Sequence, residues 1–306
     1  MNNFIKEALK AENQPHQRTV LYKTVLADLI KTDKMQKIII FGFLLFTVSI
    51  FGQTKLDPNK YYAETNTVFI KSKIFEKDRE LQIFIPDEYF KNPDKKFKVL
   101  YLFDAQNQRI FNYISGNIQF LSMTDIEPVI IVGIVTEDRW NEFLTPNNHE
   151  ETLERYKPPM GNADLLIKHI QQEIEPFLKE NYRTEDYRLA IGQSLGATFL
   201  TYATMSTENL FDYNIILSPN YDYDQKQFIE RFKKFVKADL SKTKSFYFAN
   251  GYGDDYEQKF SEPLNEVIEI LKYSNNPKIK WDYKKLDINN HGLTWLGVYN
   301  GLLNWE

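Results

Sequence analysis

A single serine stands between two glycines in residues 187–200, which read YRLAIGQSLGATFL. An apolar run ends at Gly192, and small and apolar residues follow Ser194. The pattern G-x-S-x-G between a strand and a helix is typical of a serine nucleophile, because glycines permit the tight turn and the next N–H lies at a helix N-terminus. The sequence therefore predicts that Ser194 is a nucleophile and that the Leu195 N–H stabilises an oxyanion. An ordinary turn is the alternative.

A serine nucleophile needs a base, and the base needs an acid that orients it. In the α/β-hydrolase arrangement both follow the serine, the acid first and the histidine second. The one histidine after Ser194 is His291, which follows the last predicted strand. The acid should lie in the loop after residues 245–251, where the candidates are Asp254 and Asp255, ranked equal, and then Glu257. A serine–histidine dyad without an acid is the alternative.

The second oxyanion donor should come from the loop after the predicted strand at residues 97–104, where Ala105 and Gln106 supply candidate N–H groups. Four side chains near predicted strand ends are candidate substrate contacts: Arg139, Trp140, Glu142 and Tyr221. For Arg139 and Glu142, a purely structural salt bridge is the alternative. His149, in a polar loop, is a weaker candidate for substrate contact.

Strands and helices alternate from about Thr67 onward. Residues 67–75 and 79–89 alternate apolar and polar side chains, as half-exposed antiparallel strands do. Further strands are predicted at residues 97–104, 128–135, 187–193, 213–219, 245–251 and 278–287, and helices at 162–181, 195–205, 224–236, 263–273 and 293–305. This order predicts an α/β-hydrolase fold, with a mostly parallel central sheet, two leading antiparallel strands and helices on both faces.

Residues 38–51 are almost unbroken apolar sequence, preceded by Lys37 and followed by Gly52. The run is short for a membrane span and suits the core of a signal peptide. We therefore expect a signal peptide at 35–52, a linker at 53–66 and one catalytic domain at 67–306, in a periplasmic or secreted protein. Because a signal peptide should begin the chain, we expect translation from Met35, with residues 1–34 left untranslated. An uncleaved anchor, which would be the protein's only membrane contact, and a buried core segment are the alternatives.

The chain of 306 residues has no cysteine, four histidines and a formal net charge of −4. The missing cysteine excludes disulfides, thiolate–zinc sites and cysteine nucleophiles, and the histidine spacing predicts no multi-histidine metal site. Evenly scattered, mildly acidic charge predicts no nucleic-acid partner. We therefore expect a small-molecule ester as substrate and no metal or other cofactor.

From about Thr67 onward the sequence resembles the putative-esterase branch of the α/β-hydrolases. That branch includes esterase D-like enzymes, enterochelin esterases, feruloyl and acetylxylan esterases, and mycolyltransferases. The resemblance is carried by KVLYLFDAQN at 98–107, IVGIVTEDRWNEFLTP at 131–146, YRTEDYRLAIGQSLGATF at 182–199, IILSPNYDYD at 215–224 and NHGLTWLGVYNGLLNW at 290–305.

The chain departs from the family pattern at two positions beside the candidate nucleophile. The family often has histidine where Gln193 stands and a second glycine where Ala197 stands. The resemblance implies a secreted serine hydrolase that cleaves a siderophore, feruloyl or sugar ester through an acyl-enzyme. Acyl transfer by the same residues and a non-catalytic binding protein on the same fold are the alternatives.

Overall fold

The structure is a computed structural model, and it describes residues 60–147, 149–155 and 160–305. The expected upstream segment, the signal peptide and the first half of the linker lie outside the described residues. The described residues all belong to one compact unit. No helix within the described ranges is long and apolar enough to cross a membrane.

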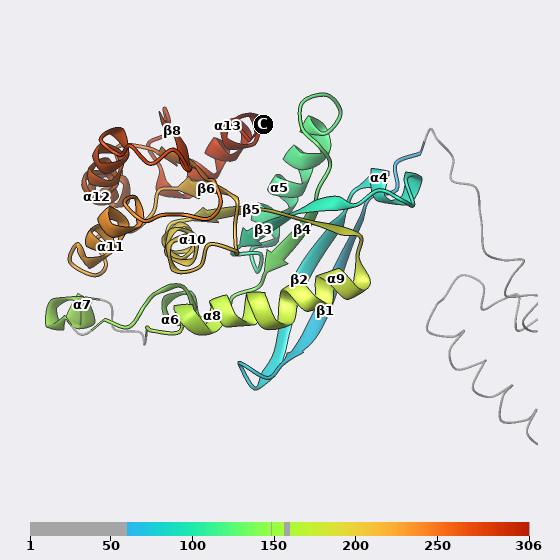
Figure 1. Cartoon of the computed structure of the whole chain (residues 1–306), viewed down its shortest axis with the longest axis horizontal. Coiled ribbons are helices and arrows are strands. Elements are labelled where there is room, and N and C mark those ends of the chain that lie inside the picture. The colour runs from blue at the N-terminus through green and yellow to red at the C-terminus, as the bar shows by residue number, and fades with distance from the viewer. Residues whose placement is uncertain (1–59, 148, 156–159, 306) are drawn as a thin grey trace, which may run out of the picture. The chain divides into compact units, whose positions relative to one another are not determined.

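The described chain is built around an eight-stranded sheet with the order β1-β2-β4-β3-β5-β6-β7-β8 (Figure 1). The strands are β1 (Glu64–Ser72), β2 (Lys77–Ile85), β3 (Phe97–Phe103), β4 (Ile130–Ile134), β5 (Thr184–Gln193), β6 (Tyr213–Leu217), β7 (Lys244–Asn250) and β8 (Ile279–Lys285). Strand β2 pairs antiparallel with β1 and β4, and the other pairings are parallel. The predicted sheet is confirmed, although β1 begins inside the stretch assigned to the linker.

Both faces of the sheet are apolar. In β3, Tyr101 and Phe103 belong to one buried cluster, and Leu100 and Leu102 belong to another. Successive side chains of a strand point to opposite faces, so a strand with apolar side chains on both faces needs cover on both sides.

Helices supply that cover. The α-helices are α4 (Asp87–Lys91), α5 (Gln108–Leu121), α6 (Arg139–Phe143), α7 (Glu150–Arg155), α8 (Ala163–His169), α9 (Glu175–Asn181), α10 (Leu195–Ser206), α11 (Gln227–Phe235), α12 (Asp255–Lys272) and α13 (Val298–Leu303). A π-helical segment, η2 (Ile170–Ile174), joins α8 to α9, and a 3₁₀ segment, η3 (His291–Gly297), precedes α13. Helices α5 and α13 pack with Leu100 on one face, and α8, α10, α11 and α12 pack with Phe103 on the other. Helices on both faces, as predicted, are confirmed.

The short helices α4, α6 and α7 were not predicted, and two longer helices also differ from the predictions. Helix α5 was not predicted; it is capped by Asn107, whose side chain accepts the Arg109 N–H at 3.2 Å. Helix α12 begins at Asp255 instead of at residue 263, because Asp254 caps it by accepting the Glu257 N–H at 2.8 Å. Pro263 therefore lies inside the helix and does not begin it. This earlier start places Glu257 in the first turn of a helix.

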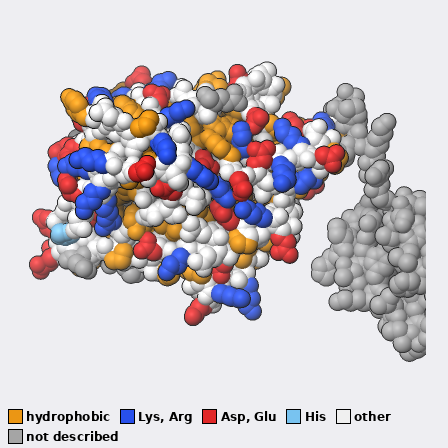
Figure 2. All heavy atoms as spheres, viewed as in Figure 1, with side chains coloured by type: hydrophobic (Ala, Val, Ile, Leu, Met, Phe, Trp, Pro, Cys, Tyr) orange, Lys and Arg blue, Asp and Glu red, His pale blue; other side chains and the backbone are white. Residues whose placement is uncertain are grey.

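The loops with the candidate chemistry follow the carboxyl ends of neighbouring parallel strands. Ala105 follows β3, Ser194 follows β5, Gly251 follows β7, and His291 comes after β8. The carboxyl edge of an open α/β sheet is the usual place for a ligand site. Figure 2 shows acidic and basic side chains mixed over the face in view.

Candidate active site

Ser194 occupies a sharp turn between β5 and α10. Its backbone has φ 56° and ψ −120°, a combination that non-glycine residues rarely adopt. The turn is held by the Ser194 N–H, which donates to the Leu217 carbonyl of β6 at 2.9 Å. A Cβ at Gly192 would lie 2.5 Å from the Gly196 carbonyl, so the close approach of β5 and α10 requires glycine. The strand and helix expected on either side of the serine are both present.

The two candidate donors in the β3–α5 loop differ in availability. The Ala105 N–H donates to the Ile134 carbonyl at 3.1 Å, so it is not available to bind an oxyanion. Gln106 is exposed, and its N–H makes no hydrogen bond within the described residues. Its side chain spans the loop, donating to Asp104 Oδ1 at 3.0 Å and accepting the Thr136 N–H at 3.1 Å. Gln106 is therefore the better placed donor of the two. The Leu195 N–H, the other expected donor, lies at the first position of α10.

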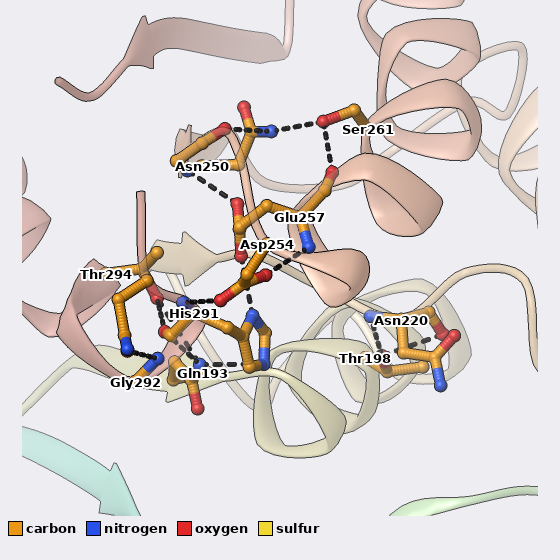
Figure 3. A network of polar contacts seen from close by, with 12 residues as sticks. Gln193, Thr198, Asn220, Asn250, Asp254, Glu257, Ser261, His291, Gly292 and Thr294 are labelled. Atoms are coloured by element: carbon orange, nitrogen blue, oxygen red, sulfur yellow. Dashed lines mark hydrogen bonds and ion pairs between the residues drawn. The ribbon is translucent and has the colours of Figure 1, made fainter. Parts of the chain in front are cut away.

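His291 and Glu257, which follow β8 and β7 in the chain, contact each other, as Figure 3 shows. His291 Nδ1 lies 2.5 Å from Glu257 Oε1. Glu257 is completely buried, and its other oxygen accepts the Gly251 N–H at 2.6 Å. The carboxylate lies in the first turn of α12, where the helix dipole favours negative charge. This contact is the geometry expected of an acid that orients a histidine.

The three candidate acids thus separate by geometry. Asp254 caps α12 and accepts the backbone N–H of His291, so it contacts the main chain and not the ring. Partial burial raises the pKa of Asp254, but hydrogen bonds from the Glu257 and His291 N–H groups outweigh burial and leave that pKa below its usual value. Asp255 is exposed. The structure reverses the ranking from sequence, because Glu257 alone of the three contacts the imidazole.

Two of the expected substrate contacts are buried and committed to other partners. Glu142 is 3% exposed and binds Arg79 at 2.8 and 2.5 Å, so it pairs with a strand residue and not with Arg139. Tyr221 has no exposed surface, and its hydroxyl lies 2.7 Å from Thr201 Oγ1. Neither side chain can reach a ligand in this structure, and we withdraw both as substrate contacts.

Arg139 lies near the Ser194 turn, where it pairs with Asp104. Its Nε and Nη2 lie 2.5 and 2.9 Å from the two carboxylate oxygens of Asp104, and its side chain is 37% exposed. A Cβ at Gly196 would lie 3.2 Å from Asp104 Oδ2, which shows how closely this ion pair approaches α10. Trp140, next along α6, is half-buried against the core.

The other described histidines lie elsewhere. His169 is buried in α8 with its Nδ1 2.5 Å from Glu173, and His149 contacts Gln227. Within the described ranges, no group of three or more His, Asp or Glu side chains is arranged to hold a metal ion.

One neighbour of His291 was not predicted from the sequence. Gln193 Nε2 lies 3.0 Å from His291 Nε2, and its position directly before the nucleophile was the available signal.

The chain matches a known protein family and a curated relative. The family model described as Putative esterase matches residues 72–294. The uncharacterized protein YjcH of Bacillus subtilis (strain 168) is 26% identical over 212 residues, which are 66% of this chain and 81% of that protein.

Two solved structures share the fold at low sequence identity. An IroE-like serine hydrolase from Shewanella oneidensis superposes with a TM-score of 0.70 at 20% identity, covering 78% of this chain and 79% of that one. The siderophore hydrolase EstB from Aspergillus nidulans superposes with a TM-score of 0.61 at 14% identity, covering 83% and 98% of the two chains. The chain therefore belongs to the Putative esterase family of α/β-hydrolases and is a carboxylic ester hydrolase.

Proposed function

We propose that the ester is cleaved by a Ser194–His291–Glu257 triad through an acyl-enzyme. The observation that carries this proposal is the 2.5 Å contact between His291 Nδ1 and the buried Glu257 carboxylate, at the sheet edge that also presents the Ser194 turn. A buried carboxylate on Nδ1 keeps the proton there, which leaves Nε2 unprotonated and able to act as a base.

The reaction divides into two half-reactions. In the first, Ser194 Oγ attacks the ester carbonyl while its proton passes to His291 Nε2, and the N–H groups of Leu195 and Gln106 hold the oxyanion. The tetrahedral intermediate then expels the alcohol, which takes the proton from His291. In the second half-reaction, water attacks the acyl-enzyme by the same route, so that the acid is released and Ser194 is restored.

A fluorophosphonate probe tests the nucleophile directly. The probe should label the wild-type protein on the peptide that contains Ser194, as located by mass spectrometry. Ser194→Ala should lose the label, and Ser206→Ala, which removes an exposed serine at the end of α10, should keep it. Labelling of Ser194→Ala at the wild-type rate would refute the assignment.

We further propose a siderophore-, feruloyl- or sugar-ester substrate and a periplasmic or secreted location. Support for the substrate comes from the sequence resemblance and from the siderophore hydrolase among the similar folds. Support for the location comes from the apolar run at residues 38–51. Hydrolysis rates across acetyl, feruloyl and catecholate esters test the substrate class. Added alcohol acceptors would reveal acyl transfer, which uses the same residues.

A further inference from the structure

Gln193 is the last residue of β5 and is 7% exposed. Its amide nitrogen lies 3.0 Å from His291 Nε2, 3.1 Å from the His291 carbonyl oxygen and 3.3 Å from Thr294 Oγ1 (Figure 3). Within the described chain, His291 Nε2 is hydrogen-bonded to Gln193 and has no hydrogen bond to the Ser194 hydroxyl. The residue before the candidate nucleophile therefore touches the nitrogen that must act as base.

The orientation of the Gln193 amide follows from its partners. A carbonyl oxygen cannot donate, so the amide group that faces the His291 carbonyl must be the NH₂. The same NH₂ faces His291 Nε2, which must then accept. That requirement fits a neutral ring whose Nδ1–H donates to Glu257 Oε1 at 2.5 Å. The contacts of the ring with Glu257 and Gln193 thus both select the neutral tautomer that carries its proton on Nδ1.

Charged and titratable groups around the ring come mainly from α12 and the turn before it. Glu257 binds Nδ1, Asp254 binds the backbone N–H of His291, and the Tyr256 ring centroid lies 5.4 Å from the imidazole centroid. The β5 and η3 contacts, Gln193 and Thr294, are uncharged. Glu257 contacts Nδ1, and the Gln193 NH₂ cannot pair with a protonated Nε2, because two N–H groups cannot hydrogen-bond to each other.

We propose that Gln193 is a positioning residue that holds the resting His291 ring neutral, with its Nε2 lone pair ready for the serine proton. This inference rests on the proposed triad. The amide has two hydrogens and three acceptors within 3.3 Å. When Nε2 takes the proton from Ser194, Gln193 can keep its hydrogen bonds to the His291 carbonyl and Thr294 without changing rotamer. Gln193 thus resists protonation of His291 Nε2 by solvent. During the reaction it gives up its hydrogen bond to Nε2 when that nitrogen takes the serine proton.

Replacement of Gln193 by methionine tests the donor while preserving side-chain length. The His291 carbonyl keeps a partner in this variant, because Thr294 Oγ1 donates to it at 2.8 Å. Loss of the donor should move the acid limb of the kcat/KM profile to higher pH by about 0.5–1 unit, the size of one net hydrogen bond. Gln193→Glu, which supplies an acceptor in place of a donor, should move it further in the same direction. Gln82→Met in β2, where the side chain is 8% exposed, is the matched control and should leave the profile in place.

Nitrogen-15 NMR of the histidine side chains in the full chain gives a readout that needs no turnover, and His291→Ala identifies the signal. The resting wild type should show Nδ1 protonated and Nε2 unprotonated, and the Gln193→Met ring should protonate at a higher pH than the wild-type ring. Protonated Nε2 in the neutral wild-type ring, or a Gln193→Met midpoint that stays in place or moves to lower pH, would overturn the inference. The titration can be repeated in Ser194→Ala, so failure of the proposed nucleophile is distinguished from failure of this inference.

Discussion

Glu257→Gln is the sharpest test of the proposed triad, because the substitution keeps the shape of the side chain and removes its charge. Both Glu257 oxygens act as acceptors, one from His291 Nδ1 at 2.5 Å and one from the Gly251 N–H at 2.6 Å. An amide offers only one acceptor. The variant must therefore either lose the loop contact or turn an N–H toward Nδ1, which selects the wrong tautomer of the base.

The size of the effect can be estimated in two ways. Unit charges about 4 Å apart at an effective dielectric constant of about 20 attract by ~4 kcal/mol, and this attraction to the transient imidazolium would be lost. Neutralising the acid of a serine–histidine–acid triad elsewhere lowers kcat by about 10⁴-fold, or ~5.4 kcal/mol. We therefore expect Glu257→Gln to lower kcat by roughly 10³- to 10⁴-fold.

The assay is hydrolysis of a p-nitrophenyl ester, with thermal unfolding measured in parallel. Asp255→Asn is the matched control, because Asp255 lies in the same helical turn and is exposed. It should keep nearly full activity. Asp254→Asn should give a small loss, since an asparagine oxygen can still cap α12 and accept the His291 N–H. A folded Glu257→Gln enzyme within tenfold of wild type, or a large loss in Asp255→Asn, would refute the assignment of the acid.

Four further predictions concern other parts of the chain. Ser194→Ala should lower kcat by about 10⁴- to 10⁶-fold with the fold intact, and near-wild-type turnover would show that the nucleophile is misassigned. His291→Ala should lose activity to a similar degree and His149→Ala much less; the reverse pattern would move the base to His149. Arg79→Met should lower the free energy of unfolding by about 3–5 kcal/mol in urea, since it leaves the buried Glu142 charge unpaired, whereas Lys77→Met, at an exposed pair, should change it by less than about 1 kcal/mol. Expression from Met35 in a bacterium should give an exported protein whose N-terminus lies near Gln53, and expression from Met1 should impair export. N-terminal sequencing decides this last point, and an intact Met1 in the membrane fraction would indicate an anchor.

The sequence could predict the parts of the site that depend on local pattern. The strand before Ser194 and the helix after it follow from hydrophobicity and glycine spacing, and the position of His291 after the last strand follows from the order of elements. These features lie within one segment of the chain or in the alternation of segments, so one sequence is enough to find them.

The carboxylate that contacts His291 could not be predicted, because its position depends on where α12 begins. Reading Pro263 as the helix start left Glu257 in a loop, whereas the Asp254 cap starts the helix earlier and turns Glu257 toward the ring. Burial of Glu142 depends in the same way on Arg79, which is 63 residues distant in sequence. The choice between Ala105 and Gln106 required knowing that the Ile134 carbonyl takes the Ala105 N–H. Such long-range partners cannot be read from local pattern.

The positive φ of Ser194 makes the proposed catalytic residue a cost to the stability of the fold. A non-glycine residue in such a region stores about 1–3 kcal/mol of strain, a sizeable share of the ~5–15 kcal/mol by which a typical domain is stable. Glycine would relieve the strain and remove the hydroxyl together. Laboratory evolution for heat resistance alone would therefore favour loss of the proposed nucleophile, so any thermostability screen of this protein must select for turnover at the same time.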